Sequence, residues 1–290
     1  MKKILLLLGI FSLLNASKVE LLVLGSGGPE IDGRASTSYI LFIDNKAKLI
    51  VDMGSGSMLG FEKSGAKLED VDAVVLTHLH IDHSVDLPSY VKAGYFTSRS
   101  KNLSIIAPYG NKYFPSCDEY LENLFGEKGA YRYMNDVLTN KSDSFKLVPK
   151  NIYGTTITKI KYEEFSLKFI RVHHGIVPSL ALRIDVEDKS IVISGDTNNE
   201  NENLQKIAKN ADLFVAHHAI AEFDRGYATT LHMNPSKIAQ VANDAKVKSI
   251  LLTHRMRRTL GLEKQTLKTI KEKFQGNIIF AEDFMKILVD

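Results

Sequence analysis

Several features that define other classes of protein are missing from this chain of 290 residues. Cys117 is the only cysteine, so no internal disulfide can form, and a disulfide-built scaffold is excluded. An excess of one charge is missing too, because 37 lysines and arginines face 34 aspartates and glutamates. This balance gives no support for a polyanion-binding surface, so nucleic acid is not an expected partner.

Long apolar runs are confined to the start of the chain. Lys2 and Lys3 precede the apolar segment Ile4–Leu14, and small or polar residues follow at 15–17. This order is typical of a secretory signal, so we predict a signal peptide over residues 1–17 and a periplasmic or secreted protein. The alternatives are an uncleaved anchor and a buried first strand. No other segment is long and apolar enough to cross a membrane, so no stable span is expected after signal removal.

A phosphate-binding glycine loop is also missing. Gly25–Pro29 follows a strand-like run, but neither G-x-G-x-x-G nor Gly-Lys-Ser/Thr is present, so a nucleotide loop is not favoured. The remaining residues 18–290 suit one large α/β domain. Within it, residues 109–165 depart most from the pattern of the rest and are predicted to be a variable insertion. We expect a helix over 111–139 there, followed by strands over 150–165.

What the chain does contain is a dense cluster of metal-binding side chains. His78, His80, Asp82 and His83 lie within six positions, directly after the apolar run Val71–Leu76, which predicts a buried strand. Residues two apart in an extended segment point the same way, so His78 and His80 can bind one ion. Asp82 and His83 follow where the chain should leave the strand, and from there they can reach a second ion. The sequence therefore predicts a metal site.

The H-x-H-x-D-H pattern resembles the metallo-β-lactamase superfamily, in particular the branch of ribonuclease Z and arylsulfatase-like hydrolases. Three further motifs occur in the order of that superfamily, and each follows an apolar, strand-like run: His173-His174-Gly175, Ser194-Gly195-Asp196-Thr197 and Thr253-His254. A following Pro-x-x-x-x-Arg stretch resembles the one after the ligand histidine of ribonuclease Z, which favours His174 over His173. The resemblance implies a four-layer αββα sandwich of two mixed β-sheets.

The resemblance also implies a ligand set for each of two metal ions. One ion would take His78, His80, His174 and Asp196, and the other Asp82, His83, Asp196 and His254, with Asp196 as the bridge. Mixed histidine and carboxylate ligands suggest Zn²⁺, with Mn²⁺ or Fe as alternatives. The resemblance further implies that Asp82 accepts a proton from the attacking water and that His232 is the general acid. His232 has a structural alternative, the capping of a loop.

The predicted function is therefore hydrolysis of phosphodiester or sulfate esters by an exported dinuclear metalloenzyme acting on a small anionic substrate. The alternatives are a ribonuclease Z-like 3′ tRNA endonuclease, a lactone hydrolase and a protein that binds metal or ligand without turnover. Two features weigh against tRNA: the start of the chain looks secretory, and no Gly-Pro-rich, Lys-bearing arm like that of ribonuclease Z is present. His218 replaces the glutamate of the His-Glu-Ala motif of ribonuclease Z, which argues against the carboxylate-assisted proton relay of that enzyme. Three arginines after the last ligand are substrate-binding candidates, with a solvated charge run as the alternative: Arg255, Arg257 and Arg258.

The insertion has two interpretations. Its aromatic side chains could form a lid over the metals. They could equally build the core of a helical hairpin or a contact between the chains of a homodimer. The aromatic residues concerned are Tyr109, Tyr113, Phe114, Tyr131 and Tyr133.

Overall fold

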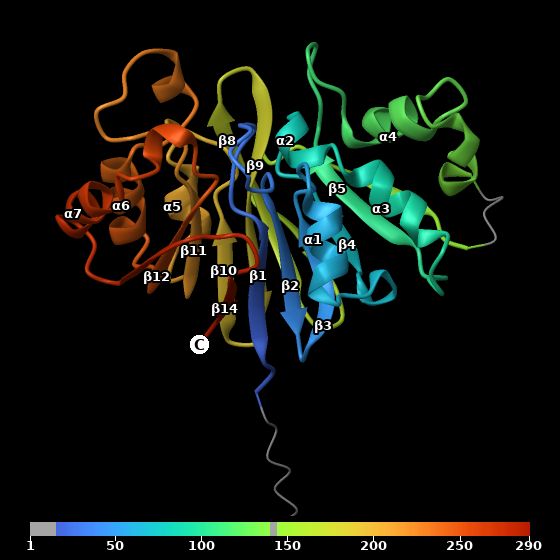
Figure 1. Cartoon of the computed structure of the whole chain (residues 1–290), viewed down its shortest axis with the longest axis horizontal. Helices are drawn as coiled ribbons and strands as arrows, with labels where there is room; N and C mark the ends of the chain where they lie inside the picture. The colour runs from blue at the N-terminus through green and yellow to red at the C-terminus, as the bar shows by residue number, and fades with distance from the viewer. Residues whose placement is uncertain (1–15, 140–143) are drawn as a thin grey trace, which may run out of the picture.

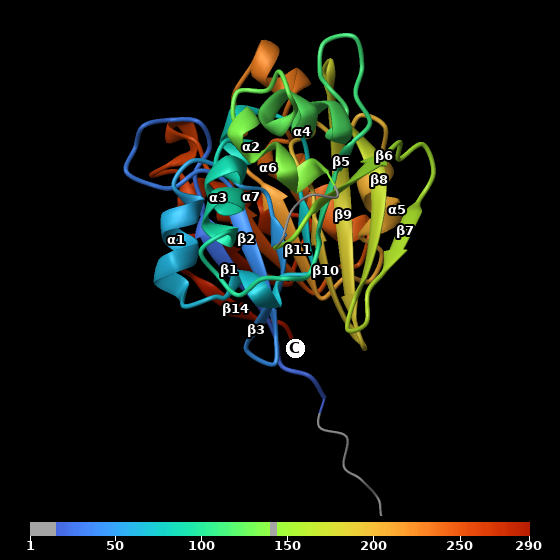
Figure 2. The same cartoon turned by 90° about the vertical axis from the view of Figure 1, so that its right-hand side faces the viewer.

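Two mixed β-sheets packed face to face form the centre of the molecule, and helices cover their outer faces (Figures 1 and 2). The computed structural model describes residues 16–139 and 144–290. Within these residues each sheet has seven strands. The predicted αββα class is therefore confirmed. Most of the predicted signal segment 1–17 lies outside the described residues, so export stays a prediction. In the part of the chain that is described, no helix could cross a membrane.

The first sheet is built mainly from the N-terminal half of the chain. Its strand order is β14-β1-β2-β3-β4-β5-β6. The strands are β1 (Val19–Gly25), β2 (Ser38–Ile43), β3 (Lys46–Val51), β4 (Ala73–Val75), β5 (Leu103–Pro108), β6 (Leu147–Ile152) and β14 (Lys286–Leu288).

The second sheet follows in the order β13-β12-β11-β10-β9-β8-β7. Its strands are β7 (Thr158–Lys161), β8 (Ser166–His174), β9 (Val177–Val186), β10 (Lys189–Ile193), β11 (Leu213–His217), β12 (Ser249–Thr253) and β13 (Asn277–Phe280). Strand β9 is antiparallel to both β8 and β10, while β10 to β13 are parallel. The carboxyl ends of β8, β10, β11 and β12 therefore meet at one edge.

The helices lie in two outer layers. The α-helices are α1 (Ser57–Ser64), α2 (Ile81–Ser84), α3 (Leu87–Gly94), α4 (Cys117–Phe125), α5 (Asn203–Ile207), α6 (Pro235–Asp244) and α7 (Glu263–Lys271). The 3₁₀ turns are η1 (Leu68–Asp70), η2 (Arg132–Leu138), η3 (Tyr227–Thr230) and η4 (Arg257–Thr259).

The apolar periodicity of the strands explains the layers. Alternate residues of a strand face opposite sides, and both sides are buried here. On β2, for example, Leu41 belongs to the cluster between the sheets, whereas Ile40 and Phe42 belong to the cluster under the helices of the first half. A third cluster lies under α5, α6 and α7. One apolar layer thus packs the two sheets against each other, and the other two pack the helices onto their outer faces.

The continuous helix expected over residues 111–139 is wrong. Residues 111–116 form a loop, and α4 begins only at Cys117, where Ser116 and Glu119 form a capping box. Helix α4 ends at Gly126, and a separate 3₁₀ turn, η2, follows it. The loop matters for function because it points toward the same edge as the metal-binding motif (Figure 1).

Candidate metal centre

The predicted ligands converge at the edge where the strands end. His78 and His80 follow β4, and Asp82 and His83 lie in the short helix α2. His174 ends β8, Asp196 follows β10 and His254 follows β12. Segments far apart in sequence thus deliver seven side chains to one place. All of them are buried except His80, which is half-buried.

Four of these side chains form a first ligand set. The ligand atoms of His78, His80, His174 and Asp196 lie within 4.8 Å of one another. His78 Nε2 is 3.0 Å from His80 Nδ1, and Asp196 Oδ2 is 3.8 Å from the Nε2 atoms of both His78 and His174. The neighbouring His173 is partly exposed, and its Nδ1 lies 3.0 Å from Asn198 Oδ1, outside this set.

A second set lies on the other side of Asp196 and includes a residue that the sequence did not nominate. His83, Asp196, His217 and His254 offer ligand atoms within 4.8 Å of one another. Asp82 belongs here as well, because its Oδ2 is 3.2 Å from His254 Nε2 and 3.5 Å from His83 Nε2. The structure therefore brings together all seven predicted ligands, with Asp196 shared by both sets.

Both ring nitrogens of His217 have hydrogen-bond partners. Nδ1 lies 2.7 Å from Asp196 Oδ1, and Nε2 lies 3.2 Å from the hydroxyl of Tyr39. A ring that donates from Nδ1 to the carboxylate accepts at Nε2 from that hydroxyl. His217 thus orients the shared carboxylate and leaves Asp196 Oδ2 for a cation. In the sequence, His217 follows an apolar, strand-like run, as several predicted ligands do. In the structure, β11 pairs with β12 so that His217 lies opposite Thr253, the residue before His254.

The donor set fits divalent cations. Nε2 of His83, His174 and His254 is buried and has no hydrogen-bond partner among the described residues. Such orphaned atoms are rare in folded proteins, and a metal ion would satisfy all three. His174 Nδ1 donates to the carbonyl of Leu231 at 3.0 Å, which leaves its Nε2 lone pair facing the set.

Asp52 supports the centre from behind. Its Oδ1 accepts from the backbone N–H of Thr77 at 2.7 Å, and its Oδ2 accepts from the hydroxyl of Thr77 at 2.9 Å and from His83 Nδ1 at 2.8 Å. Asp52 is fully buried and has a φ of 60°. Carboxylate partners of this kind fix the ring and tautomer of a ligand histidine. Gly28 packs on the far side, where a Cβ would lie 2.9 Å from His254 Cε1.

The electrostatics separate the two ligand sets. Burial lowers the pKa of His78 well below its usual value and also lowers the pKa of His174, so the first set presents neutral imidazoles. In the second set burial opposes the charge of His83, but Asp52 and Asp82 outweigh it and raise the His83 pKa to about 10. The pKa of Asp196 is held well below its usual value, because neighbouring histidines led by His254 outweigh its burial.

The predicted general acid lies beside the centre. His232 Nδ1 is 3.9 Å from Asp196 Oδ2, and its ring centroid is 5.3 Å from that of His174. Burial lowers the pKa of His232 to about 3, with Asp196 opposing. His218 is fully buried, neither of its ring nitrogens has a hydrogen-bond partner within the described residues, and burial lowers its pKa to about 3 as well.

The substrate-binding interpretation is wrong for Arg255, whereas for Arg257 and Arg258 it stays a prediction. Arg255 is buried, its guanidinium pairs with Glu263 and lies over the ring of Phe280, so it cannot reach a substrate. Arg257 is exposed, but its guanidinium donates to the carbonyl of Ile31. Arg258 is exposed in η4.

The aromatic residues of the insertion divide between the two interpretations. Phe114 lies next to the metal centre, with its ring centroid 5.9 Å from that of His80, and Asn111 in the same loop donates to the carbonyl of Ile176 at 2.8 Å. The loop therefore forms one wall of the site. Tyr131 instead packs on Phe125 of α4, and the ring of Tyr133 lies under Lys92. These two belong to the core and surface of the helical hairpin.

With this geometry in place, comparison with known families is decisive. The model of the family described as Anti-Pycsar protein Apyc1 matches residues 19–275. The chain belongs to this family. Relatives of this Apyc1-family chain include the ribonuclease Z of Archaeoglobus fulgidus, 23% identical and covering 92% of this chain and 96% of that protein. A ribonuclease Z of Listeria monocytogenes is 27% identical over 81% of this chain and 88% of the relative.

Solved structures show the same fold. The metallo-β-lactamase fold protein YhfI from Bacillus subtilis superimposes with a TM-score of 0.72 at 21% identity, covering 93% of this chain and 99% of YhfI. The short form of human tRNase Z gives a TM-score of 0.71 at 20% identity, with the same coverage. This Apyc1-family chain is thus a metal-dependent hydrolase of ester bonds with the metallo-β-lactamase fold, as the sequence predicted.

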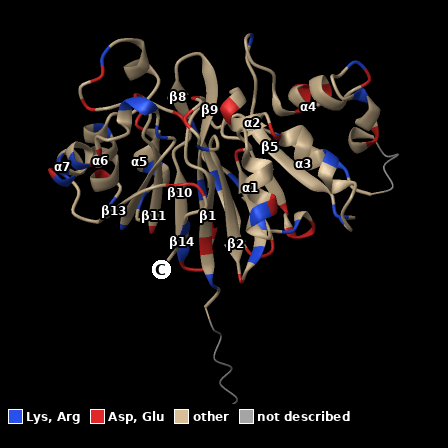
Figure 3. Cartoon of the chain, in the orientation of Figure 1, with Lys and Arg blue, Asp and Glu red and all other residues tan. Residues whose placement is uncertain are grey.

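One prediction conflicts with these comparisons. Nucleic acid was not an expected partner, because the overall charge is balanced. The curated relatives are named ribonuclease Z, a class that acts on RNA. Net charge averages over the whole surface, and Figure 3 shows that basic and acidic residues occur throughout the fold. A local basic surface can therefore exist within a nearly neutral chain.

Proposed function

We propose that the protein is a dinuclear metal-dependent phosphodiesterase. The observation that carries this proposal is the position of Asp196 Oδ2 between the two ligand sets, 3.8 Å from His174 Nε2 and 3.4 Å from His254 Nε2. A carboxylate oxygen between two sets of imidazoles can bridge two cations. Imidazole and carboxylate donors favour Zn²⁺, with Mn²⁺ and Fe as alternatives. Two bound ions would supply Lewis-acid stabilisation of the charge that develops on a phosphoryl group.

The residues divide the remaining work. His78, His80, His174 and Asp196 would hold the first ion, and Asp82, His83, Asp196 and His254 would hold the second. Asp82 stays ionised, since His83 and His254 outweigh the effect of its burial and lower its pKa, so it can accept a proton from an attacking water.

His232 is the proposed general acid. Its ring is neutral, because burial lowers its pKa. An anionic phosphodiester beside the ring adds negative charge, which favours the protonated form. His232 can then donate a proton to the leaving oxygen.

RNA is the first substrate class of the proposal, because the curated relatives carry the name ribonuclease Z. A small phosphodiester is the second. His218 favours it, since this histidine replaces the glutamate of the ribonuclease Z motif and no tRNA-gripping arm is recognisable in the sequence. We also propose export, on the pattern of residues 1–17.

The test is the initial rate of the full chain, loaded with Zn²⁺ or Mn²⁺ and with its metal content measured. The substrates are bis(4-nitrophenyl) phosphate, a dinucleotide, a tRNA precursor and 4-nitrophenyl sulfate. We expect phosphodiester cleavage that falls at least about tenfold in His232→Ala, since general acids contribute ~10²–10⁴ in rate. Asp72→Asn, a surface change, is the control. Two bound metals without phosphodiester cleavage, or faster cleavage of the sulfate, would refute the proposal.

A further inference from the structure

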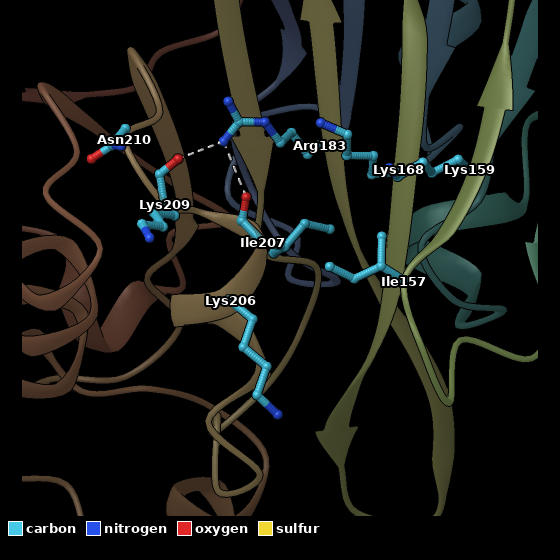
Figure 4. Close-up of a pocket in the computed structure, with 8 residues that line it drawn as sticks. All are labelled: Ile157, Lys159, Lys168, Arg183, Lys206, Ile207, Lys209 and Asn210. Atoms are coloured by element: carbon cyan, nitrogen blue, oxygen red, sulfur yellow. Dashed lines mark hydrogen bonds between the residues drawn. The ribbon is translucent and has the colours of Figure 1, made fainter.

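A pocket on the outer face of the second sheet carries a high density of positive charge (Figure 4). It lies between strands β7, β8 and β9 and the end of helix α5, and its volume is about 450 Å³, within the range of ligand-binding pockets. The described residues that line it include no aspartate or glutamate. Its five cationic side chains define the basic pocket: Lys159, Lys168, Arg183, Lys206 and Lys209.

Three of these cations form one row across neighbouring strands (Figure 4). Lys159 of β7 lies directly opposite Lys168 of β8, and Lys168 lies directly opposite Arg183 of β9. Because neighbouring strands are ~4.8 Å apart, the three residues occupy only about 10 Å of the sheet. Like charges directly opposite one another destabilise a sheet. Proteins keep such unfavourable arrangements mainly at functional sites, so the row indicates that this surface binds something.

One carboxylate compensates part of the row. Arg183 Nε donates to Asp185 at 2.7 Å, and Lys168 Nζ lies 2.8 Å from the other oxygen of the same carboxylate. The Arg183 guanidinium also donates to the carbonyls of Ile207 and Lys209, at 3.2 Å and 2.8 Å (Figure 4). Arg183 is therefore a fixed part of the pocket wall and ties the end of α5 to the sheet.

The other three cations have no compensating charge. Lys159, Lys206 and Lys209 are exposed, and no carboxylate of the described residues forms an ion pair with them. Lys206 Nζ donates to the neutral side chain of Asn203, at 2.8 Å. Five cations and one carboxylate leave the basic pocket with a net charge of +4, whereas the whole chain carries only +3. This concentration of charge would attract an anion.

The basic pocket is separate from the metal centre. Lys168 and His174 lie six residues apart on β8, or about 20 Å at ~3.3 Å per residue. None of the residues that line the pocket belongs to either ligand set. A small molecule held in the pocket therefore does not touch the metal centre, and the lining of the pocket alone determines what it binds.

The lining favours phosphate groups. Lysine ammonium groups bind phosphate as point charges, and arginine adds a planar fork of donors. A single phosphate group carries a charge of about −1.5 to −2 near pH 7, which would offset half of the charge of the pocket at most. An anion with two or more phosphate groups would balance it.

We propose that the basic pocket binds a compact anion with at least two phosphate groups, at a site distinct from the substrate site. The strand row contacts the anion from one side, and Lys206 and Lys209 contact it from the side of α5. The bound anion relieves the repulsion within the row and stabilises the folded state. Inorganic diphosphate and an organic bisphosphate offer the same groups, and the experiment separates these two sources. The proposal does not depend on hydrolysis at the metal centre.

The test compares two triple variants of the metal-loaded full chain by isothermal titration calorimetry. The pocket variant carries Lys159→Gln, Lys206→Gln and Lys209→Gln. The control variant carries the same change at three exposed lysines elsewhere: Lys128, Lys268 and Lys271. The probes are inorganic phosphate, inorganic diphosphate and fructose 1,6-bisphosphate. Phosphate groups also bind metal ions, but neither variant alters a metal-site residue, so the difference between the variants reports the basic pocket.

We expect the pocket variant to bind diphosphate or the bisphosphate roughly tenfold or more weakly than the control variant. A single lost charge-assisted contact can have an effect of that size. Inorganic phosphate should bind the control variant more weakly than the better of these two probes. Tighter binding of diphosphate would indicate an inorganic ligand, and tighter binding of the bisphosphate an organic one.

Urea unfolding provides an independent measurement, because a ligand that binds only the folded state stabilises it. The better probe should raise the urea midpoint of the control variant more than that of the pocket variant. Equal affinities of the two variants for both probes would overturn the proposal, as would an equal rise in the urea midpoint. Control-variant binding of inorganic phosphate as tight as that of the better probe would overturn the assignment to two or more phosphate groups.

Discussion

Replacement of Asp52 by asparagine tests how the fold prepares the metal centre. Asparagine tolerates the left-handed backbone of this position, where φ is 60°, so the backbone should persist. The amide has one acceptor oxygen in place of two. If that oxygen keeps the bond from the Thr77 N–H, the new NH₂ group faces His83 Nδ1 and the Thr77 hydroxyl. The imidazole must then accept at Nδ1, which moves its proton to Nε2.

The position of this proton determines how strongly the substitution lowers metal affinity. Nε2 is the atom that His83 offers to a cation, and a protonated nitrogen cannot bind one. Changes to such supporting partners typically cost 10–100-fold in metal affinity, or about 1.4–2.8 kcal/mol. Replacing the carboxylate also weakens charge-assisted hydrogen bonds, each worth ~1.5–3 kcal/mol. The folded state of the metal-free protein should therefore lose about 2 kcal/mol.

Chelator competition with Zn²⁺ measures both sites, and urea unfolding of the metal-free protein measures stability. One site should weaken strongly, while the site of His78, His80 and His174 changes less. Asp72→Asn is the matched control, because Asp72 pairs with Lys101 on the surface. Wild-type affinity at both sites together with an unchanged urea midpoint would show that Asp52 does not support the centre.

Three further outcomes follow from the structure. Tyr39→Phe removes a hydroxyl bonded to the buried His217, so urea unfolding should show a loss of ~1–3 kcal/mol. Asp212 accepts from the N–H and hydroxyl of Ser190, and its pKa is lowered because its hydrogen bonds outweigh burial. Its contribution is present above the unfolded value of 3.8 and lost as pH falls through the lower folded value, so Asp212→Asn should destabilise more at pH 7 than at low pH. Burial raises the pKa of Cys117 to about 12, so a thiol reagent at pH 8 should modify the folded protein far more slowly than the urea-unfolded chain.

The sequence was sufficient for the parts of the fold that depend on local apolar pattern. The apolar runs Val19–Leu24 and Leu103–Ala107 predict strands, because a strand buried on both faces is apolar throughout. The structure has β1 and β5 at these positions. The edge strand β14 was missed. It has only three residues, Lys286–Leu288, and none is fully buried, so its sequence resembles a loop. Its strand conformation comes from pairing with β1, more than 260 residues away.

The site shows the same limit. His78, His80, Asp82 and His83 could be predicted because their spacing alone brings them together. The role of His217 depends on Tyr39, a residue 178 positions away, and no local pattern reveals such a contact. The prediction for Arg255 was wrong because it relied on nearness in sequence. This residue follows a metal-site residue in sequence, but the chain turns at His254 with a φ of 51°, and the arginine enters the interior to meet Glu263.

These differences bear on substrate choice. The two ligand sets would promote attack on many esters, so they do not distinguish a small phosphodiester from RNA. The surfaces around the ligand sets can distinguish the two substrates. Phe114 lies at one wall beside His80, whereas Arg171 and His173 line a separate hollow along β8. A small substrate should depend on the wall of Phe114 alone, and only a longer polyanion should also depend on Arg171, which is exposed on β8. The same chemistry at the metals can therefore serve either substrate, and the reach of the substrate along β8 decides between them.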